Sequence, residues 1–215
     1  MENTPPNYPQ VIEHSSASIV IALSDTEIGK IQLPSTLVFV DVHTGEPVNL
    51  VEDGGGPTIQ KETMALIQAN LINDLMPKFI RLQPWQLDDG TTHEMLVMER
   101  LLPLPIHHFE YSVRLEMLKR FEQQIEELHQ NNFVHGDFQR PTTVFNRGDQ
   151  KWMYKNIVQT EQGLRLLDAG FGTKLDKDNI KLFVSILIRE RDEVKYFRSY
   201  YIGSSTEKNM NTSLP

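Results

Sequence analysis

Two apolar runs in this chain each deliver an aspartate to a turn. The first is FVHGDF at residues 133–138, which contains Asp137, and the second, about thirty residues later, is LLDAGF at 166–171, which contains Asp168. Phosphoryl transfer needs mainly positioning and charge neutralisation, with one carboxylate near the attacking hydroxyl and a second holding Mg²⁺ on nucleotide phosphates. The two motifs therefore predict a catalytic role for Asp137 and a metal-binding role for Asp168.

The first hundred residues have the pattern of short strands around one helix. Apolar runs broken by turn residues lie at 18–23, 37–42, 48–51, 79–82 and 95–98. Residues 58–73 follow a glycine-rich loop and carry apolar residues at helical spacing, with Thr58 as a candidate N-cap. We expect the order β-β-β-α-β-β with antiparallel strands.

Helical periodicity dominates the rest of the chain. Apolar residues repeat every three or four positions from Val113 to Leu128, directly before the first aspartate motif. Short strands at 143–146 and 164–167 and a further helix at 179–189 complete the predicted elements. Residues 203–215 are polar and without period, so we expect a frayed tail.

Composition limits the partners and the compartment. The chain of 215 residues has a formal net charge of −8, which argues against nucleic acid or an anionic membrane as a partner. It contains no cysteine, and no apolar run approaches the roughly 20 residues that span a bilayer. We expect a soluble, cytoplasmic protein without a membrane span.

The order of these motifs and elements resembles the protein-kinase-like superfamily over residues 20–200. The resemblance implies an α+β, two-lobed fold: an antiparallel β-rich N-lobe with one helix at 11–100, a hinge near Glu99, and a truncated helical C-lobe at 101–202. Flexible segments at 1–10 and 203–215 would flank the lobes. ATP and Mg²⁺ would be the cofactors, with Glu99 at the nucleotide.

His-Gly-Asp in place of His-Arg-Asp is similar to small-molecule, lipopolysaccharide and other atypical kinases. Few residues separate Asp168 from the next helix, which leaves no room for an ordinary activation segment. His135 is expected to be a packed spacer in the loop. The aromatic run at 196–200 also resembles the terminal helix of short atypical kinases.

Three departures from the family pattern concern the nucleotide site. The family places a lysine on its third strand, paired with a helix glutamate, but alignment of 47–51 with that strand puts Val51 at the lysine position. Lys30 is then the best substitute and Lys61 a poorer one. Glu62 matches the helix glutamate, although both Lys30 and Glu62 can also be read as solvated side chains.

The other two departures concern the metal and the phosphates. Thr142 stands at the fifth position after Asp137, where the family has a metal-binding asparagine, and its hydroxyl is a weaker Mg²⁺ ligand. Gln139 is a speculative replacement. The phosphate-covering loop, read at residues 27–34, retains only Gly29.

Three functional hypotheses follow from these residues. The first is a degenerate pseudokinase that acts through an unidentified protein partner. The second is an active atypical phosphotransferase that acts on a small molecule, a glycan or a protein. The third is an α+β binding domain unrelated to kinases.

Overall fold

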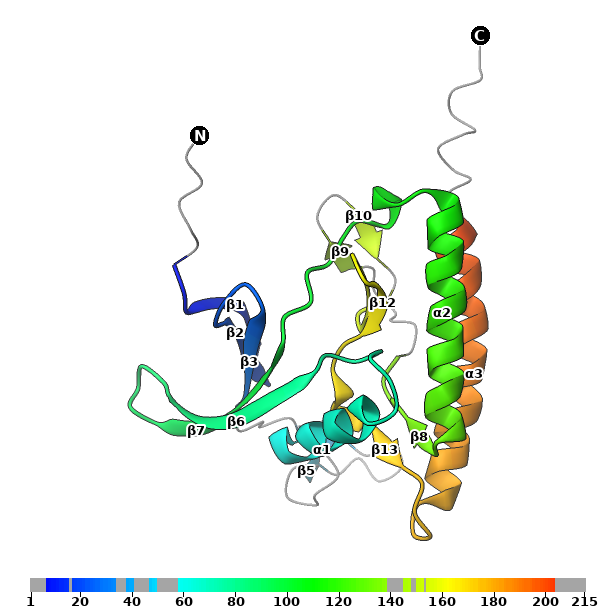
Figure 1. Ribbon diagram of the computed structural model, residues 1–215. Coiled ribbons are helices and arrows are strands. Elements are labelled where there is room, and N and C mark those ends of the chain that lie inside the picture. The colour runs from blue at the N-terminus through cyan, green and yellow to red at the C-terminus, as the bar shows by residue number, and fades with distance from the viewer. Residues whose placement is uncertain are drawn as a thin grey trace, which may run out of the picture. The chain divides into compact units, whose positions relative to one another are not determined.

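The computed structural model describes residues 7–15, 17–33, 38–40, 47–49, 58–138, 145–147, 150–152 and 154–203. Figure 1 shows its mixture of strands and helices. The chain forms two compact units, the first comprising residues up to Thr63 together with Phe79–Arg100, and the second Met64–Lys78 together with the chain from Leu101 onward.

A five-stranded antiparallel sheet makes up most of the first unit. Its strands are β1 (Gln10–His14), β2 (Ser18–Ala22), β3 (Glu27–Gln32), β6 (Phe79–Gln86) and β7 (Thr92–Glu99). The order across the sheet is β1-β2-β3-β7-β6, so β3 is the central strand. A separate ladder pairs β4 (Val38–Val40) with β5 (Pro47–Asn49).

One face of this sheet carries an apolar cluster. Its buried members are Ile19, Ile21, Ile31, Met95 and Val97. Side chains alternate between the faces of a strand, so Lys30, next to buried Ile31, points to the opposite face. Gly29 fits here because a β-carbon would lie 2.3 Å from Sδ of Met95.

Helix α1 (Ile59–Asn70) follows the β4–β5 ladder in the chain. The predicted N-cap is present, since the hydroxyl of Thr58 accepts a hydrogen bond from the Lys61 amide at 3.1 Å. One face of α1 is buried through Ile59, Glu62, Leu66 and Ala69. The division between the two units falls within this helix, after Thr63.

The second unit contains two long helices, α2 (Tyr111–Gln130) and α3 (Ile180–Gly203), which lie side by side in Figure 1. Short ladders pair β8 (Phe133–Val134) with β13 (Thr173–Lys174), β9 (Phe145–Arg147) with β10 (Gln150–Trp152), and β11 (Ile157–Thr160) with β12 (Gly163–Leu166). Two 3₁₀ turns, η1 (Ile106–His108) and η2 (Ala169–Phe171), complete the elements.

Aromatic side chains pack together in the core of the second unit. Phe121 of α2 contacts Phe197 of α3 with ring centroids 5.4 Å apart, and Tyr154 meets Phe197 edge-on at 5.0 Å. Tyr201 stacks on Phe197 at 5.4 Å. Because α3 is one continuous helix, the aromatic run 196–200, predicted as a separate terminal helix, belongs to the same helix as the predicted segment 179–189.

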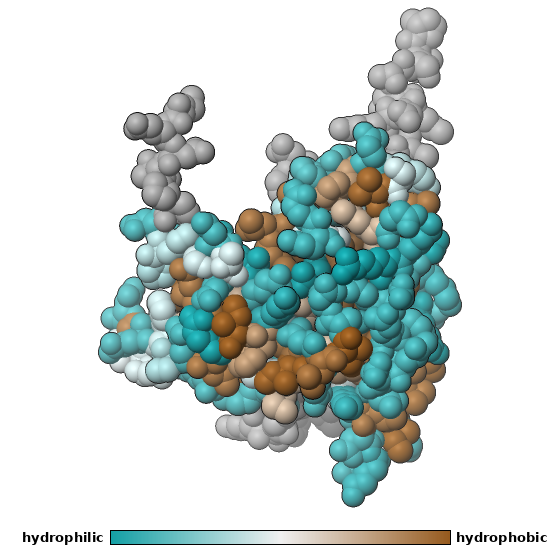
Figure 2. Space-filling model, in the orientation of Figure 1, coloured by the Kyte–Doolittle hydropathy of each residue, from teal (hydrophilic) through white to brown (hydrophobic). Residues whose placement is uncertain are grey.

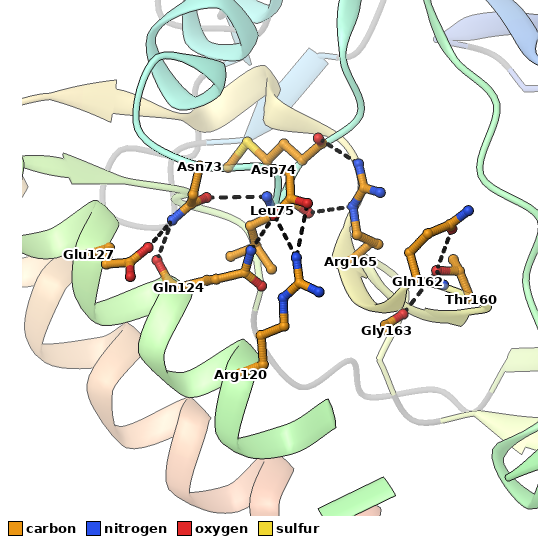
Figure 3. Close-up of polar contacts among 11 residues, drawn as sticks. Asn73, Asp74, Leu75, Arg120, Gln124, Glu127, Thr160, Gln162, Gly163 and Arg165 are labelled. Carbon is orange, nitrogen blue, oxygen red and sulfur yellow. Dashed lines mark hydrogen bonds and ion pairs between the residues drawn. The ribbon is translucent and has the colours of Figure 1, made fainter. Parts of the chain in front are cut away.

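The segment after α1 is fixed by polar contacts, several of which Figure 3 draws. Asp74 accepts two hydrogen bonds from Arg120 of α2 at 3.0 and 3.2 Å, and one from Gln124 at 2.5 Å. Arg165 of β12, which is buried, donates to the carbonyls of Leu75 and Met76. Both α2 and β12 therefore hold this segment.

The sequence patterns located most of the elements but missed two strands of the large sheet, β1 and β3. The predicted phosphate loop at 27–34 is wrong, because residues 27–32 form β3. Strand β1 precedes the first predicted strand, so β3 is the third strand of the chain. Tyr8, predicted to lie in a flexible terminus, donates to Asp25 at 2.6 Å and accepts from Arg100 at 2.7 Å. Within the described residues, no helix is long and apolar enough to cross a membrane.

Candidate functional site

Lys30 and Glu62 form an ion pair in the first unit. The ammonium nitrogen of Lys30 lies 2.8 Å from Oε2 and 3.0 Å from Oε1 of Glu62. Both side chains are largely withdrawn from solvent, at 15% and 4% exposure. Strand β3 directs the lysine away from the apolar cluster of the sheet, and the buried face of α1 supplies the glutamate.

This pair corrects the sequence interpretation in two respects. The third strand does not lack a lysine, since the observed third strand carries Lys30. Neither residue is a solvated surface charge. The error came from aligning 47–51 with the third strand, whereas those residues contribute β5 of a separate ladder; Val51 lies outside the described residues, and Lys61 is exposed.

The His-Gly-Asp segment lies directly after β8 in the second unit. His135 is buried, and its Nε2 lies 2.8 Å from the carbonyl oxygen of Leu167, the residue before Asp168. This contact joins the two aspartate motifs and gives His135 the packed position that was expected. Gly136 has φ +86°, and a β-carbon there would lie 2.3 Å from the carbonyl oxygen of Phe171. The glycine thus permits both the turn and the close approach.

Helix α3 also holds this turn, through hydrogen bonds to Gly136. Glu190 is buried and accepts the Gly136 amide hydrogen bond at 2.6 Å through Oε1, while its Oε2 lies 2.9 Å from Nε2 of buried His129. Arg189 donates to the Gly136 carbonyl at 2.8 Å. Both backbone polar groups of Gly136 are therefore engaged by adjacent residues of α3.

Asn156 is the side chain that holds Asp137. Its amide nitrogen donates to Oδ2 of Asp137 at 2.9 Å and to the Asp137 carbonyl at 2.8 Å. The carbonyl of Asn156 accepts from the Leu167 amide at 2.8 Å. Asn156 is buried directly before β11 and thus connects Asp137 to the chain immediately before Asp168.

The two aspartates influence each other electrostatically. Burial raises the pKa of the Asp137 carboxyl above its ordinary value, and the nearby charge of Asp168 raises it further, against the lowering effects of His135, Asn156 and Lys155. Asp168 follows β12 in the left-handed conformation, with φ 58° and ψ 77°. Backbone of this kind is uncommon for a non-glycine residue and is concentrated at functional sites.

Asp168 carries a carboxylate and Asn156 an amide oxygen, which are donor types that Mg²⁺ accepts, and a cation beside Asp137 and Asp168 would offset their like charges. No group of three or more histidines, aspartates or glutamates in the described ranges could hold a metal alone. Mg²⁺ is commonly bound by one or two carboxylates with substrate phosphates completing its shell.

Asn156 is the site residue that the sequence interpretation missed. The expected position, Thr142, lies outside the described residues, as does Gln139, and nothing is added about either. Asn156 lies 19 positions after Asp137, because a segment containing β9 and β10 separates them. The available signal was an asparagine immediately before the apolar pair Ile157-Val158, just ahead of the Asp168 motif.

The remaining predicted residue, Glu99, ends β7 opposite Glu27 of β3 and is half-buried. The next residue, Arg100, donates its amide to the Thr26 carbonyl at 2.8 Å. These contacts fix the backbone at the end of the sheet. A nucleotide-binding role for Glu99 stays a prediction.

The turn between β1 and β2 contains no glycine and is held by hydrogen bonds to a serine hydroxyl. The hydroxyl of Ser15 accepts hydrogen bonds from the Ser18 amide at 3.0 Å and the Ala17 amide at 3.3 Å. Residues 14–18 contain no glycine. The first hairpin of the sheet therefore lacks the residue type that most readily allows close approach of backbone to phosphate.

No protein-family model matches this chain, and no curated protein was found to be similar to it. Among solved structures, it is similar to the kinase PK-1 of the Cydia pomonella granulovirus, with 14% sequence identity and a TM-score of 0.45. The match covers 77% of this chain and 51% of the viral kinase. The matched region thus spans about half of that protein.

Proposed function

We propose that this chain is a kinase-like phosphotransferase that uses ATP and Mg²⁺ and transfers a phosphoryl group to a hydroxyl acceptor. The observation that carries the proposal is the ion pair of Lys30 with Glu62. A lysine on the third strand, paired with a helix glutamate, is the arrangement that protein kinases use at the nucleotide phosphates.

The second unit supplies the other chemical requirements. Asp137 would orient the acceptor hydroxyl and accept its proton, while Asp168 and Asn156 would bind the metal. His135 and Glu190 would act as positioning residues, because each holds the backbone of the loop and neither points a free group outward. The acceptor would be a small molecule, a glycan or a protein.

The glycine-free β1–β2 turn favours a second function, a pseudokinase scaffold that binds nucleotide weakly or not at all and acts through protein contacts. Side chains in this turn leave less room for phosphate oxygens than glycine would. The two functions differ in turnover, since the scaffold needs neither Asp137 nor a bound metal.

Calorimetric titration of ATP with and without Mg²⁺ tests the proposal. The wild-type protein is expected to bind ATP more tightly with Mg²⁺, and the Asp168→Asn variant to lose that metal dependence. Asp176→Asn is the matched control, because Asp176 is an exposed carboxylate of the same unit. Absence of binding at millimolar ATP would rule out the phosphotransferase and favour the pseudokinase scaffold.

Turnover then separates enzyme from scaffold. Release of phosphate, or its transfer to the protein itself, should be lost in Asp137→Asn, while ATP binding and the unfolding transition are retained. ATP binding without any turnover in the wild type would favour the scaffold. A fold check by circular dichroism on each variant keeps loss of structure apart from loss of chemistry.

A further inference from the structure

Helix α2 carries two ionisable residues on its buried side. Figure 2 shows that the side of α2 facing the viewer is largely hydrophilic, as expected for a surface helix. Arg114 and His129 are nevertheless buried, at 2% and 6% exposure. Both bind α3: Arg114 donates to the Tyr201 carbonyl at 3.0 Å, and Nε2 of His129 lies 2.9 Å from Oε2 of Glu190.

The contact between His129 and Glu190 is an expensive way to pack two helices. Within the part of the chain that the structure describes, Nδ1 of His129 is buried without a hydrogen-bond partner, which opposes folding. Glu190 is also withdrawn from water, at 3% side-chain exposure. Apolar side chains at both positions would join the helices without these penalties, because a buried polar or ionic pair often adds no stability over a hydrophobic one. Helix packing alone therefore does not explain the pair.

Glu190 connects His129 to the turn that carries Asp137. Its other oxygen, Oε1, accepts a hydrogen bond from the Gly136 amide at 2.6 Å, and Gly136 directly precedes Asp137. The terminal torsion of a glutamate is soft, so the carboxylate can rotate unless both of its oxygens are bound. The hydrogen bond from His129 to Oε2 therefore also fixes the position of Oε1.

We propose that His129 is a positioning residue of the phosphotransferase site. It orients the Glu190 carboxylate, which holds the Gly136 amide and thereby places Asp137 against the acceptor hydroxyl. This role rests on the proposed function, because it assigns His129 a task in that reaction. Misplacing a reacting group by about 1 Å can lower a rate by about a hundredfold, so a side chain that does not touch substrate can still control turnover.

Kinetics of phosphate release from ATP with Mg²⁺ test this role, on variants that circular dichroism shows to be folded. His129→Phe keeps a ring and removes the donor, and His129→Leu serves the same purpose if the phenylalanine variant does not fold. It should lower kcat at least tenfold and leave KM for ATP within twofold. The amide of His129→Gln can still donate to Glu190, so its kcat should stay within threefold of wild type. Arg114→Leu is the matched control, because it removes another buried contact of α2 with α3, and its kcat should also stay within threefold.

Amide exchange at Gly136 tests the role of His129 independently of turnover. In His129→Phe, protection of Gly136 should fall at least tenfold relative to the buried amide of Leu166, which bonds the Leu75 carbonyl. In Arg114→Leu the two amides should change together. A wild type without turnover would contradict the phosphotransferase, and the exchange data would still decide whether His129 holds the turn. Unchanged relative protection of Gly136 in His129→Phe would overturn the proposal, as would a loss of kcat that His129→Gln does not restore.

Discussion

The amide nitrogen of Asn156 donates hydrogen bonds to both the carboxylate and the carbonyl of Asp137, although the two residues are 19 positions apart. The asparagine thereby fixes the orientation of the candidate catalytic carboxylate, and its backbone carbonyl accepts a hydrogen bond from the amide of Leu167, the residue before Asp168. One residue thus connects Asp137 to the chain beside Asp168.

Replacement of Asn156 should therefore affect stability and metal binding together. Asn156→Ala leaves a partly buried carboxylate without its donor and is expected to lower the free energy of unfolding by about 2 kcal/mol. It should also remove the Mg²⁺ dependence of ATP binding. Urea unfolding and calorimetry measure the two effects. Asn156→Asp keeps an oxygen ligand but loses the donor. It should therefore keep a larger fraction of the metal dependence of ATP binding than of the unfolding free energy that Asn156 contributes. A variant that kept the larger fraction of the unfolding free energy would contradict the assigned roles.

Variants of the Lys30–Glu62 pair should separate its contribution to stability from its contribution to ATP binding. Lys30→Met should cost about 3 kcal/mol of unfolding free energy, because Glu62 would remain buried without its counterion. The double variant Lys30→Met with Glu62→Leu should recover most of that loss, since two apolar side chains replace the pair.

Nucleotide affinity supplies the functional half of this test. If Lys30 contacts phosphate, both the single and the double variant should bind ATP at least tenfold more weakly. Recovery of ATP affinity in the double variant, in parallel with stability, would mean that the pair has a structural role only. Chemical denaturation and calorimetry on the same samples distinguish these outcomes.

The sequence predicted the turns that carry Asp137 and Asp168 because apolar runs and a strongly amphipathic helix frame them. It misplaced Lys30 because β1, an edge strand exposed along its whole length, has no buried face and so no apolar alternation to reveal it. Residues 27–32 were interpreted as a phosphate loop and not as a strand, so two strands before the 37–42 run were missed and 48–51 took the place of the third strand. Asn156 was missed for a different reason: local spacing cannot reveal a contact across an intervening hairpin.

Gly136 allows the backbone of its turn to touch Phe171. Gly136→Ala adds a β-carbon 2.3 Å from a carbonyl oxygen in addition to the cost of a positive φ, so we expect a loss of at least about 3 kcal/mol. Gly90→Ala is a matched control, with φ +83° and nothing within 4 Å of the added carbon. Its loss should be about 1 kcal/mol. Equal losses, measured by thermal unfolding, would show that the contact with Phe171 does not constrain the turn.

Asp74 provides a pH-dependent prediction. Burial raises the pKa of its carboxyl, but the Arg120 charge and the hydrogen bonds from Arg120 and Gln124 outweigh this and hold the pKa below its ordinary value. A depressed native pKa stabilises the fold above the unfolded-state value of about 4, and this stability is lost as the pH falls through the native pKa.

Asp74→Asn should therefore destabilise the protein at pH 7 and much less near pH 3. The effect at pH 7 should be below about 1 kcal/mol, because the Asp74–Arg120 contact is half-exposed and screened by solvent. Urea unfolding across this range measures the difference between the two proteins. A difference that is constant with pH would mean that the Asp74 charge does not stabilise this segment.

Glu190 joins α3 to the Asp137 loop and to α2 through two acceptor oxygens. Glu190→Ala would leave the Gly136 amide without its present acceptor and remove the partner of buried His129 Nε2, so we expect a loss of about 3 kcal/mol or more. Glu190→Gln keeps one carbonyl oxygen and should lose about half as much. Amide exchange gives the local readout: in Glu190→Gln, protection of Gly136 should fall more than that of core amides in β7. Equal loss at both places would indicate global destabilisation, with no specific role for Glu190 in holding the loop.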